Sequence, residues 1–238
     1  MPRFHFAVLA MLAAASPLCA ETITLTEGVG GYAGTADTSI FAESDNAAGG
    51  GAHLYAGNTQ MGNARRALIR FDLSGIPSDA TVESVTLTLR LNLAPSSAAQ
   101  PFRLHALAGP WGEGTANPPG PGGQGTTPGS GDATWSANSN GTSTWTSPGG
   151  DFVPAASGIG NSGAVGTDLV LAGDGLRDNV AAWLADPSTN HGWILLGNEA
   201  ANGSARRFAS AEGTEGQRPR LTLVLAGPLG PPDAWLLH

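Results

Sequence analysis

The chain has 238 residues, among them 35 glycines and 17 prolines, and only 13% of its residues are charged. Because glycine and proline both weaken helix interiors, this composition predicts strands and turns with little helix. The net charge of −8 disfavours nucleic acid or an anionic membrane as the partner, since both require concentrated positive charge.

The first 20 residues have the pattern of a signal peptide. Arg3 precedes an apolar run at residues 6–15, and Ala20 ends a small-residue cleavage site. The run is too short to span a bilayer as a mature helix. We therefore predict that residues 1–20 are removed, that the protein is secreted to the periplasm or beyond, and that the mature chain does not insert into a membrane. Cleavage would also remove Cys19 and leave no disulfide.

A series of short segments with alternating or β-branched residues, separated by turn formers, predicts the strands. These segments are residues 22–26, 37–42, 51–58, 65–71, 85–93, 101–107, 167–172, 192–197, 206–210 and 220–225. The clearest alternation places one set of apolar side chains on a single face: Val85, Leu87, Leu89, Leu91 and Leu93. The series predicts an all-β fold, an antiparallel β-sandwich of jelly-roll type.

One short helix is predicted after the seventh of these segments and is expected to cover an edge or end of the sandwich. Its apolar residues fall at helical spacing: Leu176, Val180, Trp183 and Leu184. Asp174 is placed to cap the N-terminus of this helix, and Pro187 prevents its continuation.

The stretch 112–131 is rich in glycine and proline and predicts a long surface loop, because it has too little apolar surface to form a core. The strand series is incomplete on either side of this loop, so we expect one sandwich domain over residues 21–226. Residues 227–238 change composition and are expected to form a disordered tail.

Several stretches, in this order along the chain, resemble the DNRLRE domain, a family of secreted, disaggregatase-related β-sandwich modules. They are ADTSIFAESDNAAGGGAHLYAGN (36–58), RRALIRFDLSGIPSDATVESVTLTLRL (65–91), GDATW (131–135), WTSPGGDF (145–152), VAAWLADPSTNHGWILLGNE (180–199) and RRFASAEGTEGQRPRLTLVL (206–225). The resemblance covers roughly residues 36–225. It implies a β-sandwich with Ile69 and Phe71 in its core, and a similarity to carbohydrate-binding modules of polysaccharide-degrading enzymes.

Two Arg-Arg pairs hold the only concentrated positive charge in this acidic chain. One interpretation is that Arg66 and Arg70 face outward or pair with carboxylates such as Asp72 or Glu83, since arginine is mostly exposed or paired. The alternative is that several arginines converge at one end of the sandwich and hold an acidic sugar, because the guanidinium fork suits carboxylates. This candidate site comprises Arg65, Arg66, Arg70, Arg206 and Arg207.

The tryptophans divide by their sequence context. Trp183 and Trp193 lie in the predicted helix and in a predicted strand and are expected in the core. Trp111 and Trp135 flank Gly/Pro-rich loops and are expected to clamp them down. Trp145, in the sequence STWTSPGG, is the freer candidate for a platform that stacks against a sugar ring.

No catalytic pattern is present in the sequence. It contains neither Gly-x-Ser-x-Gly nor His-Glu-x-x-His, and the mature chain has no cysteine nucleophile. We therefore predict a protein that is not an enzyme and needs no cofactor. The spacing of a calcium-binding loop is also missing, although a calcium site could be assembled from Asp37, Glu212 and backbone carbonyls in a jelly-roll sandwich.

Together these features predict a secreted, non-catalytic carbohydrate-binding module for an extracellular polysaccharide or cell-surface glycan. The glycan is acidic if the arginines form the binding site, and we expect the protein to act as a monomer. The alternative is a structural or adhesive extracellular protein with no specific glycan ligand.

Overall fold

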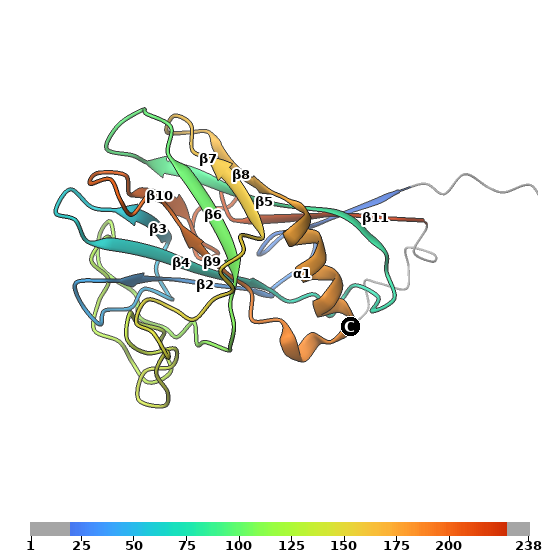
Figure 1. The fold of residues 1–238 in the computed structure, drawn as a ribbon, viewed down its shortest axis with the longest axis horizontal. Coiled ribbons are helices and arrows are strands. Elements are labelled where there is room, and N and C mark those ends of the chain that lie inside the picture. Colours follow the sequence, from blue (N-terminus) through green and yellow to red (C-terminus); the bar gives the residue numbers. More distant parts are fainter. Residues whose placement is uncertain (1–19, 228–238) are drawn as a thin grey trace, which may run out of the picture.

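The computed structural model describes residues 20–227 (Figure 1); the predicted signal peptide and tail lie outside this range apart from Ala20 and Gly227. It contains eleven strands: β1 (Glu21–Leu25), β2 (Thr35–Phe41), β3 (His53–Asn58), β4 (Ala64–Phe71), β5 (Val82–Leu93), β6 (Pro101–Ala106), β7 (Gly158–Asn161), β8 (Asp168–Ala172), β9 (Trp193–Leu196), β10 (Arg206–Ala209) and β11 (Arg220–Leu225). The helix α1 (Asp174–Ala185) and the 3₁₀ helix η1 (Pro187–Thr189) connect β8 to β9. The mostly β, antiparallel fold with one α-helix is confirmed for these residues.

The strand pairings form a closed ring rather than the two separate sheets of the predicted sandwich. The ring has eight strands in the order β5, β10, β3, β4, β9, β6, β7 and β8, and β8 pairs with β5 again. Strand β5 closes the ring because it pairs with β8 along one edge, where Thr86 lies opposite Ala172, and with β10 along the other, where Leu91 lies opposite Phe208. Outside the ring, β1 pairs with β11, and β2 pairs with β4. The alternation in the sequence predicts which face of a strand is buried, but not which edges meet.

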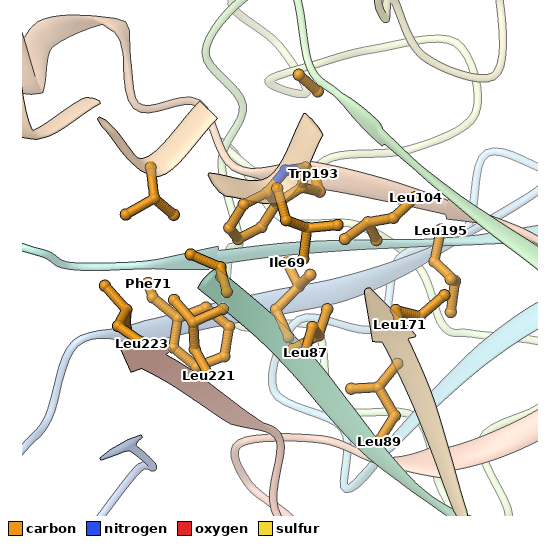
Figure 2. Packing of buried hydrophobic residues seen from close by; sticks show 14 of the residues in the cluster. Ile69, Phe71, Leu87, Leu89, Leu104, Leu171, Trp193, Leu195, Leu221 and Leu223 are labelled. Carbon is orange, nitrogen blue, oxygen red and sulfur yellow. The ribbon is translucent and has the colours of Figure 1, made fainter. Parts of the chain in front are cut away.

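The barrel interior holds the main hydrophobic core (Figure 2). As predicted, Leu87, Leu89 and Leu91 of β5 are buried there with Ile69 and Phe71 of β4. Leu93 departs from the prediction, since it lies at the end of β5 with 49% of its surface exposed. The only strand that the sequence analysis missed, β7, has the sequence GIGN and too few apolar residues to show an alternation.

Helix α1 contacts β5 and β7 and adds its predicted apolar stripe to the barrel core. The predicted cap is wrong: Gly173 occupies the N-cap position, and no side chain caps the helix. Asp174 is already in the first turn, where it accepts a hydrogen bond from Arg177. The helix ends before Pro187, as expected, and this proline begins η1.

Residues 107–157, between β6 and β7, have no strand and lie against the outer face of the barrel beside β2 and β4 (Figure 1). They contribute to a second apolar cluster, which we call the outer cluster: Ile40, Leu68, Leu107, Trp111, Ala133, Trp145 and Ile194. The predicted loop at 112–131 is therefore irregular, but its ends are fixed to the barrel. Within residues 20–227, no helix is long and apolar enough to cross a membrane.

Candidate functional site

Three of the five candidate arginines line one surface hollow, which we call the arginine hollow. Arg65 comes from β4, and Arg206 and Arg207 come from β10, on either side of β3. The hollow has a volume of about 300 Å³. Tyr55 and the exposed Leu93 also line it, so positive charge and apolar surface lie side by side.

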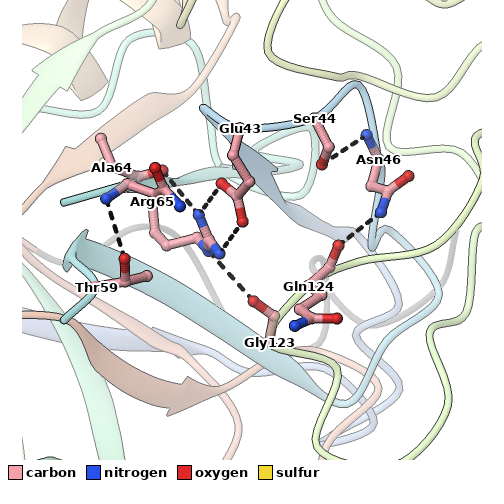
Figure 3. Close-up of polar contacts among 9 residues, drawn as sticks. Glu43, Ser44, Asn46, Thr59, Ala64, Arg65, Gly123 and Gln124 are labelled. Atoms are coloured by element: carbon pink, nitrogen blue, oxygen red, sulfur yellow. Dashed lines mark hydrogen bonds and ion pairs between the residues drawn. The ribbon is translucent and has the colours of Figure 1, made fainter. Parts of the chain in front are cut away.

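Arg65 is fixed by the protein itself (Figure 3). Both terminal nitrogens of its guanidinium donate hydrogen bonds to the carboxylate of Glu43, and Nε donates to the carbonyl of Gly123 at 3.2 Å. The guanidinium carbon also lies 4.9 Å from the centre of the Phe41 ring. Arg65 is therefore a structural ion-pair partner that forms one wall of the hollow.

The two arginines of β10 differ in how they are held. Arg206 is only 1% exposed and donates to backbone carbonyls, including those of Ala98 at 2.7 Å and Ser204 at 3.0 Å. Arg207 is half-buried, lies opposite Tyr55 in the pairing with β3, and donates from Nε to Asn92 at 2.7 Å. Among the described residues, neither arginine has a carboxylate within 4.0 Å.

The remaining two candidate arginines lie away from the hollow. Arg66 points into the outer layer, where it forms two hydrogen bonds with Glu199, at 2.7 and 2.9 Å, and stacks 4.8 Å from the centre of the Trp135 ring. Arg70 lies beside Trp111, with 5.7 Å between the guanidinium carbon and the ring centre. The five arginines therefore do not converge on one site. Arg66 instead fits the interpretation in which an arginine pairs with a carboxylate, although its partner is Glu199 rather than Asp72 or Glu83.

Trp145 is not placed to serve as a sugar platform. Its ring is 5% exposed, belongs to the outer cluster, and donates from Nε1 to the carbonyl of Thr134 at 2.9 Å. Trp111 is held in the same way by the carbonyl of His191, at 2.8 Å. Both rings pack against barrel residues and thereby hold the segment 107–157 in place, as the sequence predicted for Trp111 but not for Trp145; Trp135 is partly buried against the same cluster.

A larger groove of about 1000 Å³ lies at the other end of β4. Its walls are the start of β2, residues 70–78 and the C-terminal end of α1. Asp72 shapes this turn by accepting hydrogen bonds from the backbone nitrogen and the hydroxyl of Ser74, both at 2.9 Å. We call this groove of about 1000 Å³ the turn groove. Arg70 and Asp72 line it together, so it lacks the excess positive charge of the arginine hollow.

The structure brings the two predicted metal ligands together and adds a third carboxylate. Asp37 on β2, Glu113 in the segment after β6 and Glu212 after β10 each have one oxygen within 4.8 Å of the others. Burial and the charges of neighbouring carboxylates raise the pKa of Asp37 well above its ordinary value and that of Glu113 to about 7. The pKa of Glu212 is also raised, first by burial.

The sequence analysis missed Glu113. The available signal was its isolation, because Glu113 is the only charged residue in the Gly/Pro-rich stretch 112–131. A single carboxylate in such a stretch has no local partner, so contact with a distant part of the fold explains its placement.

Neither a search against models of known protein families nor a search among curated proteins finds a match to this chain. The resemblance to the DNRLRE domain therefore stays a prediction based on the quoted stretches.

Proposed function

We propose that the protein is a secreted, non-catalytic module that binds an acidic extracellular polysaccharide in the arginine hollow. One observation carries the proposal: three arginines and a single carboxylate, Glu43, gather at one hollow of a protein whose net charge is −8. Local positive charge in an acidic protein favours a ligand with carboxylate or sulfate groups. We also propose that the protein is secreted and that it is related to the DNRLRE domain. The closed barrel would then be a variant of a jelly-roll sandwich.

Arg207 is the residue expected to contact the ligand. A guanidinium has five N–H donors, and the hydrogen bond to Asn92 uses only one of those in Arg207. Arg65 and Arg206 are already bonded to Glu43 and to backbone carbonyls, so they supply positive potential and shape. The pKa of His53 is lowered first by burial and then by the charge of Arg207, so this arginine lies close enough to act on its neighbours.

The apolar wall of the hollow fits the other half of a sugar, its C–H face. Leu93 is exposed at the end of β5, opposite Arg207 in the pairing with β10. A volume of about 300 Å³ lies at the small end of ligand pockets, which suits a short section of a chain rather than a long groove-bound polymer. Binding should therefore depend on one or two charged sugar units.

The test is a calorimetric titration with oligogalacturonate and with the same oligosaccharide fully methyl-esterified, which keeps the shape but removes the charge. We expect binding to the acid only, weakened by added salt. Arg207→Gln should lower the affinity about 10- to 150-fold, because a charge-assisted hydrogen bond contributes about 1.5 to 3 kcal/mol. The matched control is Arg103→Gln, which removes an exposed arginine on β6, outside the hollow.

Equal affinity for acid and ester, or equal losses in Arg207→Gln and Arg103→Gln, would contradict the proposal. A loss of binding in Arg70→Gln instead would move the site to the turn groove. If a broad array of glycans showed no binding at all, the structural or adhesive alternative would replace the proposed function.

A further inference from the structure

The three clustered carboxylates are held in place by rigid contacts. The backbone nitrogen of Asp37 donates to Oε1 of Glu113 at 2.7 Å. The backbone of Glu113 packs so closely on Gly49 that a Cβ there would lie 1.9 Å from the carbonyl oxygen of Glu113. Asp132 fixes the following turn by accepting hydrogen bonds from the backbone nitrogens of Thr115 and Gly129. The cluster is therefore preorganised by segments far apart in the sequence.

Asp37 points to a missing ligand. Its side chain is 1% exposed, and Oδ2 accepts a hydrogen bond from the backbone nitrogen of Ala211 at 2.8 Å. The second oxygen, Oδ1, is buried and has no hydrogen-bond partner. Leaving a buried carboxylate oxygen without a partner is costly, so the fold retains an acceptor that a cation would satisfy.

The charge balance of the cluster leads to the same conclusion. Among residues 20–227, no arginine or histidine forms a salt bridge with Asp37, Glu113 or Glu212. Three carboxylates close together repel one another unless protons or a cation neutralise them. Glu212 is exposed, so an ion could reach the cluster from solvent.

We propose that Asp37, Glu113 and Glu212 form a Ca²⁺ site. All three ligands are hard oxygen donors, and Ca²⁺ accepts them in irregular geometry together with carbonyls and water. The three oxygens lie within 4.8 Å of one another, which is within the reach of one Ca²⁺ that binds its ligands at about 2.4 Å. Mg²⁺ requires near-ideal octahedral geometry and usually keeps several waters, so three carboxylates from separate, rigid segments favour Ca²⁺. The ion would join β2, the segment 107–157 and the loop after β10.

The experiment uses the full mature protein after dialysis against a chelator. Titration calorimetry with CaCl₂ should show one binding site per chain, and MgCl₂ should bind at least ten times more weakly. Calcium at about a hundred times its dissociation constant should raise the melting temperature by about 5 to 10 °C.

The variant Glu113→Gln should abolish the calcium-induced shift while leaving the calcium-free protein at least as stable, because one repelling charge is removed. Glu212→Gln, at an exposed position, should likewise remove the shift and serves as a second variant should Glu113→Gln fail to fold. The control Glu215→Gln changes an exposed carboxylate in the same loop and should keep the full response.

Absence of a calcium-binding heat would overturn the proposal. It would also be overturned by equal shifts with calcium and magnesium, or by a loss of the response in Glu215→Gln as large as that in Glu212→Gln. None of these results depends on glycan binding, so the site and the proposed function can fail separately.

Discussion

The barrel interior and the outer cluster both exclude water, but different interactions hold them together. The interior is made of side chains that alternate along paired strands, such as Leu87 and Leu221, which lie opposite each other in β5 and β11. The outer cluster joins strands to an irregular segment and depends on polar anchors: Trp111 and Trp145 each donate to a carbonyl, and Arg66 binds Glu199. Apolar burial on paired strands builds the first region, whereas the second depends more on specific side-chain hydrogen bonds.

A charge in the barrel interior should have the largest effect. Leu89→Asp places an unpaired carboxylate at a position that is 1% exposed, so we expect it to abolish soluble folding. Thr88→Asp, on the opposite face of β5 and paired with Arg220, should fold. Circular dichroism and the soluble yield measure both. A folded Leu89→Asp protein would show that the interior tolerates a buried charge and that apolar burial is not essential there.

A change at an anchor of the outer cluster should have an intermediate effect. Arg66→Ala removes the hydrogen bonds to Glu199 and to the carbonyl of Gly149. We expect a loss of about 1.5 to 3 kcal/mol in the free energy of unfolding, measured by urea denaturation, with the strand signal retained.

Arg66→Lys should not restore this stability, because an ammonium cannot form the two parallel hydrogen bonds. A double-mutant cycle with Glu199→Gln would separate the pair from other effects. If Arg66→Ala changed glycan binding but not stability, Arg66 would belong to a binding site after all.

The smallest effect should come from a polar contact outside both regions. Asp168 accepts hydrogen bonds from Arg90 at 3.1 Å and Arg220 at 2.8 Å on the partly exposed face of β5, β8 and β11. Burial opposes the charge of Asp168, but these hydrogen bonds lower its pKa below the ordinary value. Asp168→Asn should cost about 0.5 to 1 kcal/mol at neutral pH, as surface pairs do.

The pH dependence of this difference follows from the lowered pKa. The stabilisation is present above the pKa of an unfolded aspartate and is lost as the pH falls through the lower pKa of the folded state. Urea denaturation at several pH values should therefore show the wild type and Asp168→Asn becoming equally stable in acid. A difference that persisted at low pH would mean that Asp168 acts by packing rather than by charge.

The sequence predicted most strands because each depends on local alternation and turn residues, as in residues 85–93. It did not predict the ring, because closure depends on which strands pair with the two edges of the long strand β5. The site was only partly predictable for the same reason. Asp37 and Glu212 were chosen correctly as neighbours, but the position of Glu113 depends on how residues 107–157 return to the barrel. Trp145 was misjudged because its partners come from the same long-range packing.

The pairing of the first and last strands has a consequence for mechanical load. In the antiparallel pair of β1 and β11, Glu21 lies opposite Leu225, and Leu25 lies opposite Leu221. A force that pulls on Glu21 and Leu225 in opposite directions therefore acts at one end of this ladder and breaks its hydrogen bonds one after another, as a zipper opens. Shearing along the strands would load the bonds together and resist more strongly. We therefore expect β1 to separate from β11 at low tension when the protein is pulled between Glu21 and Leu225.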